Sequence, residues 1–348
     1  MELASPPEAC PQPPRRYAVI HSRAADPGAT PRQATILTGM TTYFGHGWEE
    51  GDILLRRDLV ASGFTDADLH ALVDRGLLRR MAYGVLAVGQ VPADPRIAHA
   101  QRAAGQARLH RDGIALTSHS ALAHHDLPLD GYVDMHGPVR AARLSSGTSS
   151  TPALQVCRPR TPPPVIPLEG GGLVVIPVVA ALQLAHEQPL APAVVVLDAC
   201  LSATLFTVTE LRDAAARMRP VAGVGRARTA VRQSRAGAQS PRETELRLFV
   251  EGLGYETETQ FPICDGPDEP PFAYTDLRIK GSRAVIEYDG EVKYETGTAA
   301  PLLAERSREQ RILRAGWGVG RVVAHDLRNR RALVKRIHDL VRGWPEAA

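Results

Sequence analysis

The chain has 348 residues, which is enough for two or three domains that each bury a core. Hydrophobic residues make up 44% and charged residues 23%, a balance that excludes a chain disordered throughout. The four cysteines form no CxxC pair, which argues against a zinc knuckle or a disulfide framework. No apolar run approaches the roughly 20 residues that span a bilayer, and the first residues lack the apolar segment of a signal peptide. We therefore expect a cytoplasmic protein with no membrane partner.

The formal charge of +3 conceals a basic segment near the C-terminus. Between Arg306 and Arg342 there are eleven arginines and lysines against three acidic residues, so this stretch carries about +8. A basic surface of this size attracts a phosphate backbone. A solvated arginine-rich face accounts for the same count, so charge alone leaves both interpretations open.

Residues 50–90 follow the winged helix-turn-helix plan. A short helical pattern precedes a second helix, which Thr65 can cap and which ends at Gly76. Two β-like runs follow, at 77–81 and 85–88, as a hairpin would require. In folds of this kind the second helix enters the major groove of DNA. The pattern predicts a DNA-binding head, or the same fold used as a protein-interaction module.

The hairpin segment LVDRGLLRRMAYGVLAVG, residues 72–89, resembles the N-terminal domain of AbiEi-type antitoxins. The resemblance implies a DNA-binding head and a cognate toxin as partner. The second helix carries three aspartates against one histidine and one arginine, so its charge opposes contact with phosphate. Arg79 and Arg80, on the first wing strand, are the better candidates for nucleic-acid contacts.

The middle of the chain, residues 91–235, shows a mixed α/β pattern. A helix is expected over 96–110, and short apolar runs follow it. The stretch 145–167 is rich in Ser, Thr and Pro and predicts a loop. The segment SHSALAHHDLP, at 118–128, also resembles the middle region of AbiEi-like proteins.

The C-terminal third opens on a helix with clear end signals. Ser240 is the expected N-cap, Pro241 the first helical residue, and Gly254 follows the end. Ser240 and Glu243 match a capping box, in which the Glu243 carboxylate accepts from the Ser240 N–H. Glu243 is therefore either a capping residue or an outer carboxylate of a site.

A β-hairpin is expected where Gly281-Ser282 joins two β-like segments, since Gly at the first central position suits a type II′ two-residue turn. This register places Asp276 directly opposite Glu287, about 5 Å away between Cβ atoms. Period-two alternation places Asp289 on the same face as Glu287. Three carboxylates on one face require a cation or raised pKa values.

An oxygen-rich site of this kind suits Mg²⁺ or Mn²⁺, because Mg²⁺ is usually held by one or two carboxylates together with waters and phosphate oxygens. Lys293 follows within four residues of Asp289 and brings a positive charge near the acids. The alternative is that Arg278 and Arg283 pair with the acids across the hairpin, which would make the cluster structural.

The order of a helix with Glu, then TDLRI, IEYDGEVKY and GWGVGRVVAHDL, resembles the PD-(D/E)XK nuclease superfamily. Within it, the segment from Ser240 to Leu340 is similar to very-short-patch-repair-like (Vsr-like) endonuclease domains of bacterial proteins. The resemblance implies a mixed sheet flanked by helices and Mg²⁺-dependent hydrolysis of nucleic-acid phosphodiester bonds, with DNA the expected substrate.

The same resemblance implies roles for individual residues. Asp276 and Glu287 would hold the metal, Asp289 would support it, and Glu243 would contribute an outer carboxylate. Where the superfamily has a lysine two residues after the second acid, this chain has Asp289, so Lys293 would take the place of that lysine.

A helix over 302–315 follows, and it ends at Gly316. Arg311 and Arg314 share one face of this helix and are candidates to hold a nucleic-acid backbone. The expected fold class is α/β (α+β) multidomain. The expected parts are a disordered arm at 1–45, a winged helix-turn-helix at 50–90, an α/β middle region at 91–235 and a Vsr-like endonuclease domain at 236–348.

Three functions remain open at this level. The first is a metal-dependent endonuclease with a winged-helix head. The second is a non-enzymatic DNA-binding regulator or AbiEi-like antitoxin whose nuclease fold is degenerate. The third is an interaction scaffold, which the acidic second helix of the head favours.

Overall fold

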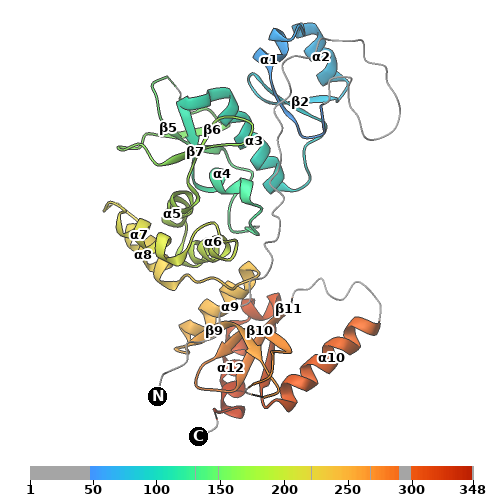
Figure 1. Cartoon of the computed structure of the whole chain (residues 1–348), viewed down its shortest axis with the longest axis vertical. Helices are drawn as coiled ribbons and strands as arrows, with labels where there is room; N and C mark the ends of the chain where they lie inside the picture. The colour runs from blue at the N-terminus through green and yellow to red at the C-terminus, as the bar shows by residue number, and fades with distance from the viewer. Residues whose placement is uncertain are drawn as a thin grey trace.

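The computed structural model describes residues 48–346, except 130, 148, 221, 267 and 290–298, and describes the backbone alone for 299–304. The arm expected at 1–45 lies outside this part of the chain. The described residues form a mixed α/β structure with three separate sheets, and the head, the middle region and the C-terminal region follow one another along the longest axis (Figure 1). None of the described helices is long and apolar enough to cross a membrane.

The head has the helix, helix and hairpin order expected of a winged helix, with a three-stranded sheet in the order β1-β3-β2. Thr65 caps α2 as predicted, because its side chain accepts from the Asp68 N–H while the Asp68 carboxylate accepts from the Thr65 N–H. The elements of the head are β1 (Ile53–Leu55), α1 (Arg56–Ala61), α2 (Asp66–Asp74), β2 (Leu78–Ala82) and β3 (Val85–Val88).

The middle region is built on a five-stranded mixed sheet in the order β6-β5-β4-β8-β7. Its strands are β4 (Ile114–Leu116), β5 (Val139–Arg143), β6 (Leu154–Cys157), β7 (Val165–Pro167) and β8 (Leu173–Val175). Its helices are α3 (Pro95–His110), α4 (Ser118–Leu122), α5 (Pro177–Glu187), α6 (Leu190–Ser202), α7 (Val208–Ala216) and α8 (Val224–Gln233).

The prediction of a loop at 145–167 is wrong, because strands β6 and β7 lie within this segment. Both are edge strands, and β6 pairs in parallel with β5 while β7 pairs antiparallel with β8. Backbone hydrogen bonds to the neighbouring strands β5 and β8 form both strands, which outweighs a local composition that favours turns.

Helix α3 joins the head to the middle region. On one side Ala104 packs with Ile53, Leu55 and Val85 of the head, while Ala103 on the other side belongs to the core of the middle region. Arg108, which is buried, donates to the Ile53 carbonyl at 2.9 Å, and Arg57 caps the end of α3 through the carbonyls of Arg108 and Leu109 at 3.0 and 3.2 Å.

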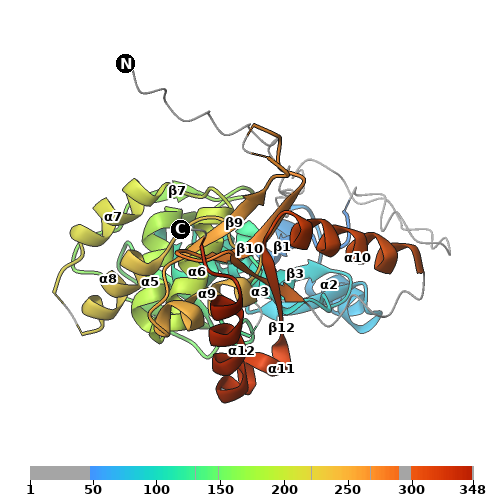
Figure 2. The same cartoon turned by 90° about the horizontal axis from the view of Figure 1, so that it is seen from below.

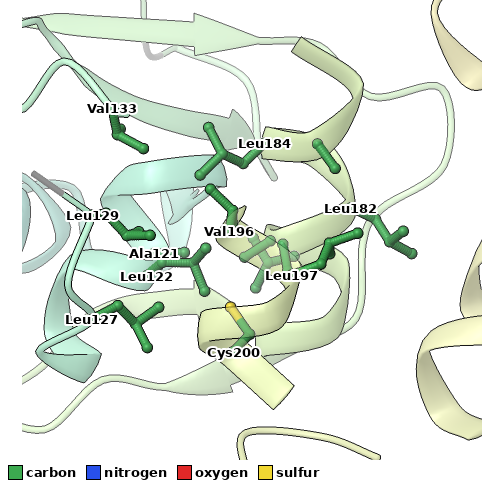
Figure 3. Packing of buried hydrophobic residues seen from close by; sticks show 14 of the residues in the cluster. Ala121, Leu122, Leu127, Leu129, Val133, Leu182, Leu184, Val196, Leu197 and Cys200 are labelled. Atoms are coloured by element: carbon green, nitrogen blue, oxygen red, sulfur yellow. The ribbon is translucent and has the colours of Figure 1, made fainter. Parts of the chain in front are cut away.

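The largest hydrophobic core lies in the middle region, between the sheet and helices α4, α5 and α6 (Figure 3). Leu122, Leu184, Leu197 and Cys200 meet there and are almost completely buried. Because α6 is apolar on nearly all sides, it occupies the centre of this layer.

The C-terminal region contains a four-stranded sheet in the order β12-β11-β10-β9, antiparallel except for the parallel pair β11 and β12. Its strands are β9 (Thr257–Ile263), β10 (Ala273–Ile279), β11 (Ala284–Asp289) and β12 (Gly318–Val323), and its helices are α9 (Pro241–Gly252), α10 (Ala299–Arg314), α11 (Ala324–Arg328) and α12 (Arg330–Gly343). The predicted helix caps are present: Ser240 accepts from the Glu243 N–H, and Gly254 has a φ of +92°.

The two faces of this sheet are covered by different helices. Leu246 of α9 and Ile337 of α12 pack with Ile286 on one face, while Ile312 of α10 packs with Val285 on the other. Figure 2 shows α10 on one side of the strands and α9 and α12 on the opposite side. Since side chains alternate along β11, Glu287 points toward the same side as Val285, which is the side of α10.

A buried ion pair connects the middle region to the C-terminal region. Arg247 of α9 donates to the Asp198 carboxylate of α6 at 2.8 Å, and both side chains are almost completely inaccessible. The Asp198 carboxylate also accepts from the Thr244 hydroxyl at 2.9 Å and the Arg235 N–H at 2.9 Å. Burial raises the pKa of Asp198, although Arg247 opposes the shift.

We expect Asp198→Ala to lower the free energy of unfolding by about 3–5 kcal/mol, because it leaves Arg247 buried without this partner. The measurement is urea unfolding followed by tryptophan fluorescence. The exposed Asp213→Ala, on α7, is the matched control and should change stability by less than about 0.5 kcal/mol. Equal stabilities for the two variants would show that the ion pair does not hold the junction together.

Candidate active site

The register of the β10–β11 hairpin is the one predicted from the sequence. Leu277 pairs with Ile286 and Ile279 with Ala284, so the next opposed positions along the two strands are Asp276 and Glu287. The prediction of a two-residue turn is wrong. The ladder ends at Ile279 and Ala284, which leaves a four-residue loop.

The loop is longer because the two residues expected to pair bond elsewhere. The Lys280 N–H donates to the Glu256 carbonyl at 2.9 Å, and the Arg283 N–H donates to the Trp344 carbonyl at 2.8 Å. Gly281 still supplies the positive φ that the loop requires, at +72°. The register survives because the extra loop residues are distributed one on each side.

The Asp276 carboxylate lies where β10 and β11 stop pairing. It accepts from the Tyr288 N–H at 2.7 Å, so a side chain takes over a backbone hydrogen bond of β11. This contact holds Asp276, which is half-buried, beside the strand that carries Glu287.

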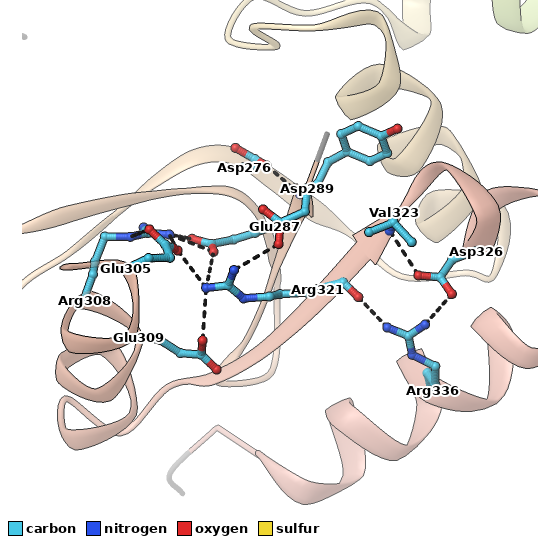
Figure 4. A network of polar contacts seen from close by, with 11 residues as sticks. Asp276, Glu287, Asp289, Glu305, Arg308, Glu309, Arg321, Val323, Asp326 and Arg336 are labelled. Carbon is cyan, nitrogen blue, oxygen red and sulfur yellow. Dashed lines mark hydrogen bonds and ion pairs between the residues drawn. The ribbon is translucent and has the colours of Figure 1, made fainter. Parts of the chain in front are cut away.

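Glu287 is buried and is held by an arginine of α10. Both of its carboxylate oxygens accept from Arg308 Nη2 at 2.8 Å (Figure 4). Burial raises the pKa of Glu287, the charge and hydrogen bond of Arg308 oppose the rise, and the nearby charge of Asp276 adds to it. The two carboxylates also occupy opposed positions of the hairpin register, since Leu277 pairs with Ile286.

Arg321 of β12 connects the remaining acids. In the parallel register Arg321 is the partner of Glu287, and its guanidinium nitrogens lie 2.9 Å from Asp289, 2.7 Å from Glu305 and 3.0 Å from Glu309 (Figure 4). Three elements, β11, β12 and α10, therefore meet through one guanidinium.

The acid cluster, defined as Asp276, Glu287, Asp289, Glu305 and Glu309, contains five carboxylates, and two arginines lie among them. With all groups ionised, the excess is three negative charges, which favours a further cation. In the described part of the chain no group of three or more His, Cys, Asp or Glu residues is arranged to hold a metal ion. Mg²⁺ held by two carboxylates and several waters would need only Asp276 and Glu287 from the cluster. Binding would require Glu287 to release Arg308.

The alternative pairing by Arg278 and Arg283 is wrong. Arg278 lies 2.9 Å from Glu346 and 3.6 Å from Glu258, and Arg283 donates to the Ala315 carbonyl at 3.5 Å. Sequence reasoning placed Arg308 and Arg321 in the basic segment without connecting them to the acids. Arg321 comes beside the acids only because β12 pairs in parallel with β11, and local sequence patterns do not predict this pairing.

Glu243 serves the start of α9. Its carboxylate accepts from the Gln239 N–H at 2.8 Å and the Ser240 hydroxyl at 2.9 Å. The backbone donor is therefore Gln239, one residue before the predicted Ser240, and both carboxylate oxygens are occupied by the cap. Burial raises the pKa of Glu243. Lys293 lies outside the described residues.

The four candidate nucleic-acid contacts divide into two kinds. Arg79 donates to the Gln90 carbonyl at 3.2 Å and to the Gln101 amide, and Arg311 donates to Asp265 at 2.9 Å, so both guanidiniums are engaged within the protein. Arg80 and Arg314 are exposed.

No protein-family model matches the chain. It is 27% identical over 162 residues to two proteins of Mycobacterium tuberculosis, uncharacterized protein MT2308 and uncharacterized protein Rv2248. The alignment covers 45% of this chain and 57% of each relative, so the chain spans little more than half the length of the curated relatives it matches. Neither name carries an activity.

The arginine contacts predict a pH dependence. The hydrogen bond from Arg308, with help from Arg321 and against some burial, lowers the pKa of Glu305 to about 2. The pKa of Glu305 in the folded state is thus lower than in the unfolded chain, where it is about 4.3. The ion pair therefore stabilises the fold above about pH 4, and this contribution is lost as the pH falls toward 2.

We expect Glu305→Gln to be less stable than wild type at pH 7, and the difference to shrink between pH 4 and pH 2. Urea midpoints at each pH measure it. Glu256→Gln, whose side chain is 84% exposed, is the control and should show no such trend. A destabilisation by Glu305→Gln that is the same at every pH would contradict the ion-pair explanation.

Proposed function

We propose that the chain is a metal-dependent phosphodiester hydrolase that cleaves nucleic acid, with DNA as the expected substrate. The observation that carries the proposal is the buried Glu287 beside Asp276, on the α10 face of a mixed sheet that helices cover on both sides. A buried carboxylate with a raised pKa and a second carboxylate next to it is typical of a functional site. The resemblance to Vsr-like endonuclease domains supports the same assignment.

Each residue has a distinct part in this proposal. Asp276 and Glu287 would hold Mg²⁺ or Mn²⁺, and when bound the ion supplies positive charge to a phosphoryl oxygen and lowers the pKa of a bound water. The Tyr288 N–H fixes the Asp276 carboxylate, and Arg321 fixes Asp289. Arg308, once released from Glu287, places a guanidinium where a phosphate group would enter.

The first test is nicking of supercoiled plasmid with Mg²⁺ or Mn²⁺. We expect Asp276→Asn and Glu287→Gln each to lower the rate by about 100-fold or more, since each removes a carboxylate at the reacting centre. Asp339→Asn, an exposed carboxylate on α12, is the matched control and should keep wild-type activity. Equal nicking activity in wild type and all variants would show that the acid cluster takes no part in the reaction.

A second candidate is a non-enzymatic DNA-binding regulator or AbiEi-like antitoxin, with a cognate toxin as partner. The bidentate contact of Arg308 with Glu287 favours it, because this ion pair closes the acid cluster without a metal. The winged head, with Arg80 exposed on its first wing strand, supplies the surface. Both candidates place the protein in the cytoplasm, where the nucleic acid is.

If the head binds DNA, Arg80→Ala should reduce the slope of log affinity against log salt by about 1, the loss of one phosphate contact. Fluorescence anisotropy with labelled duplex measures the slope. Arg217→Ala, at the end of α7, removes the same charge elsewhere and should leave the slope unchanged. An unchanged slope for Arg80→Ala would exclude it from the contact, and tight binding without any nicking would favour the regulator.

A further inference from the structure

Two arginines lie side by side at one edge of the middle sheet. Strands β5 and β6 run parallel, and the last pair in their register is Ala142 with Cys157. The next residues along the two strands are Arg143 and Arg158. Neighbouring strands are about 4.8 Å apart, so two positive charges leave the sheet at the same level and at the carboxyl ends of both strands.

These arginines line a hollow of about 360 Å³. Its lining contains two guanidinium groups and two hydroxyl groups and no carboxylate, from Arg143, Leu144, Ser145, Ser146, Arg158 and Pro159. The adjoining turn before β4 adds Arg111 and Asp112, whose charges offset each other. The hollow therefore offers hydrogen-bond donors and a local charge of about +2 to whatever enters it.

Neither guanidinium has a partner among the described residues. Arg143 Nε is buried with no acceptor. By contrast Arg140, three residues earlier on the same strand, donates to Glu187 at 2.7 Å. A buried donor without an acceptor and like charges on adjacent strands both destabilise a fold. Arg158 is exposed and Arg143 is half-buried. An anion placed between the two arginines would remove the repulsion between their charges.

We propose that this hollow binds a phosphate group, carried by a nucleotide or by a nucleic-acid strand. Guanidinium groups bind phosphate through paired hydrogen bonds, and two of them surround it with charge. The hollow lies at the carboxyl ends of the parallel pair β5 and β6. The site belongs to the middle region and shares no residue with the acid cluster, so it does not depend on the proposed hydrolase.

Binding is tested on the full chain in EDTA, so that no metal-dependent reaction takes part. The probes are inorganic phosphate, AMP and a fluorescein-labelled DNA strand, titrated by calorimetry for the first two and by anisotropy for the third. The variant is Arg143→Gln with Arg158→Gln. The control is Arg212→Gln with Arg217→Gln, which removes two exposed charges at α7.

We expect wild type and the control to bind at least one of the probes with equal affinity. The double variant should bind the same probe at least about tenfold more weakly. Binding of phosphate and AMP identifies a nucleotide site, whereas binding of DNA alone identifies a strand. The proposal is overturned if wild type binds none of the probes, or if the control loses as much affinity as the double variant.

A thermal readout separates binding from misfolding. In phosphate-free buffer at low salt the double variant should melt at or above the wild-type temperature, because the repulsion between the two arginines is gone. Added phosphate should raise the melting temperature of wild type and leave that of the double variant unchanged. A double variant that melts lower and still responds to phosphate would assign the arginines a structural part only.

Discussion

The C-terminal region depends on charge neutralisation between β11 and α10. The strand brings Glu287 and Asp289 to the face that α10 covers, and an unpaired buried carboxylate there would cost several kcal/mol. Arg308 and Arg321 remove this cost by pairing with acids from both elements. The helix can therefore cover an acidic strand end, while the apolar contact of Ile312 with Val285 lies further along the same face.

The same neutralisation determines what the acid cluster can do. In the proposed hydrolase a divalent cation would compete with Arg308 for the oxygens of Glu287, so the strength of this ion pair would set the affinity for the metal. Under the first proposal this ion pair would be weak enough for a metal to displace Arg308. Under the second proposal it would be strong enough to keep the metal out. The two proposed functions thus differ in one equilibrium.

Much of this site follows from the sequence where the determinants are local. The cap at Ser240 and the opposition of Asp276 and Glu287 need only helix-end chemistry and strand alternation. The role of Arg321 did not follow, because its pairing with β11 spans the crossover through α10. Strands β6 and β7 were missed because the composition of 145–167 favours turns, whereas pairing with β5 and β8 makes these segments extended. The turn at Gly281 differs because Glu256 and Trp344 take the N–H groups of its flanking residues.

Helix α3 contributes residues to the core of the head and to the core of the middle region, so one helix connects the two parts. Arg57 and Arg108 tie the helix to the head through carbonyls, and Ala103 and Ala107 bury it in the middle region. If the head binds a double helix, α3 would fix the orientation of the middle sheet relative to the bound DNA. If the head binds DNA as proposed, the distance from the bound DNA to the acid cluster would depend on the contact between α6 and α9 at Asp198 and Arg247.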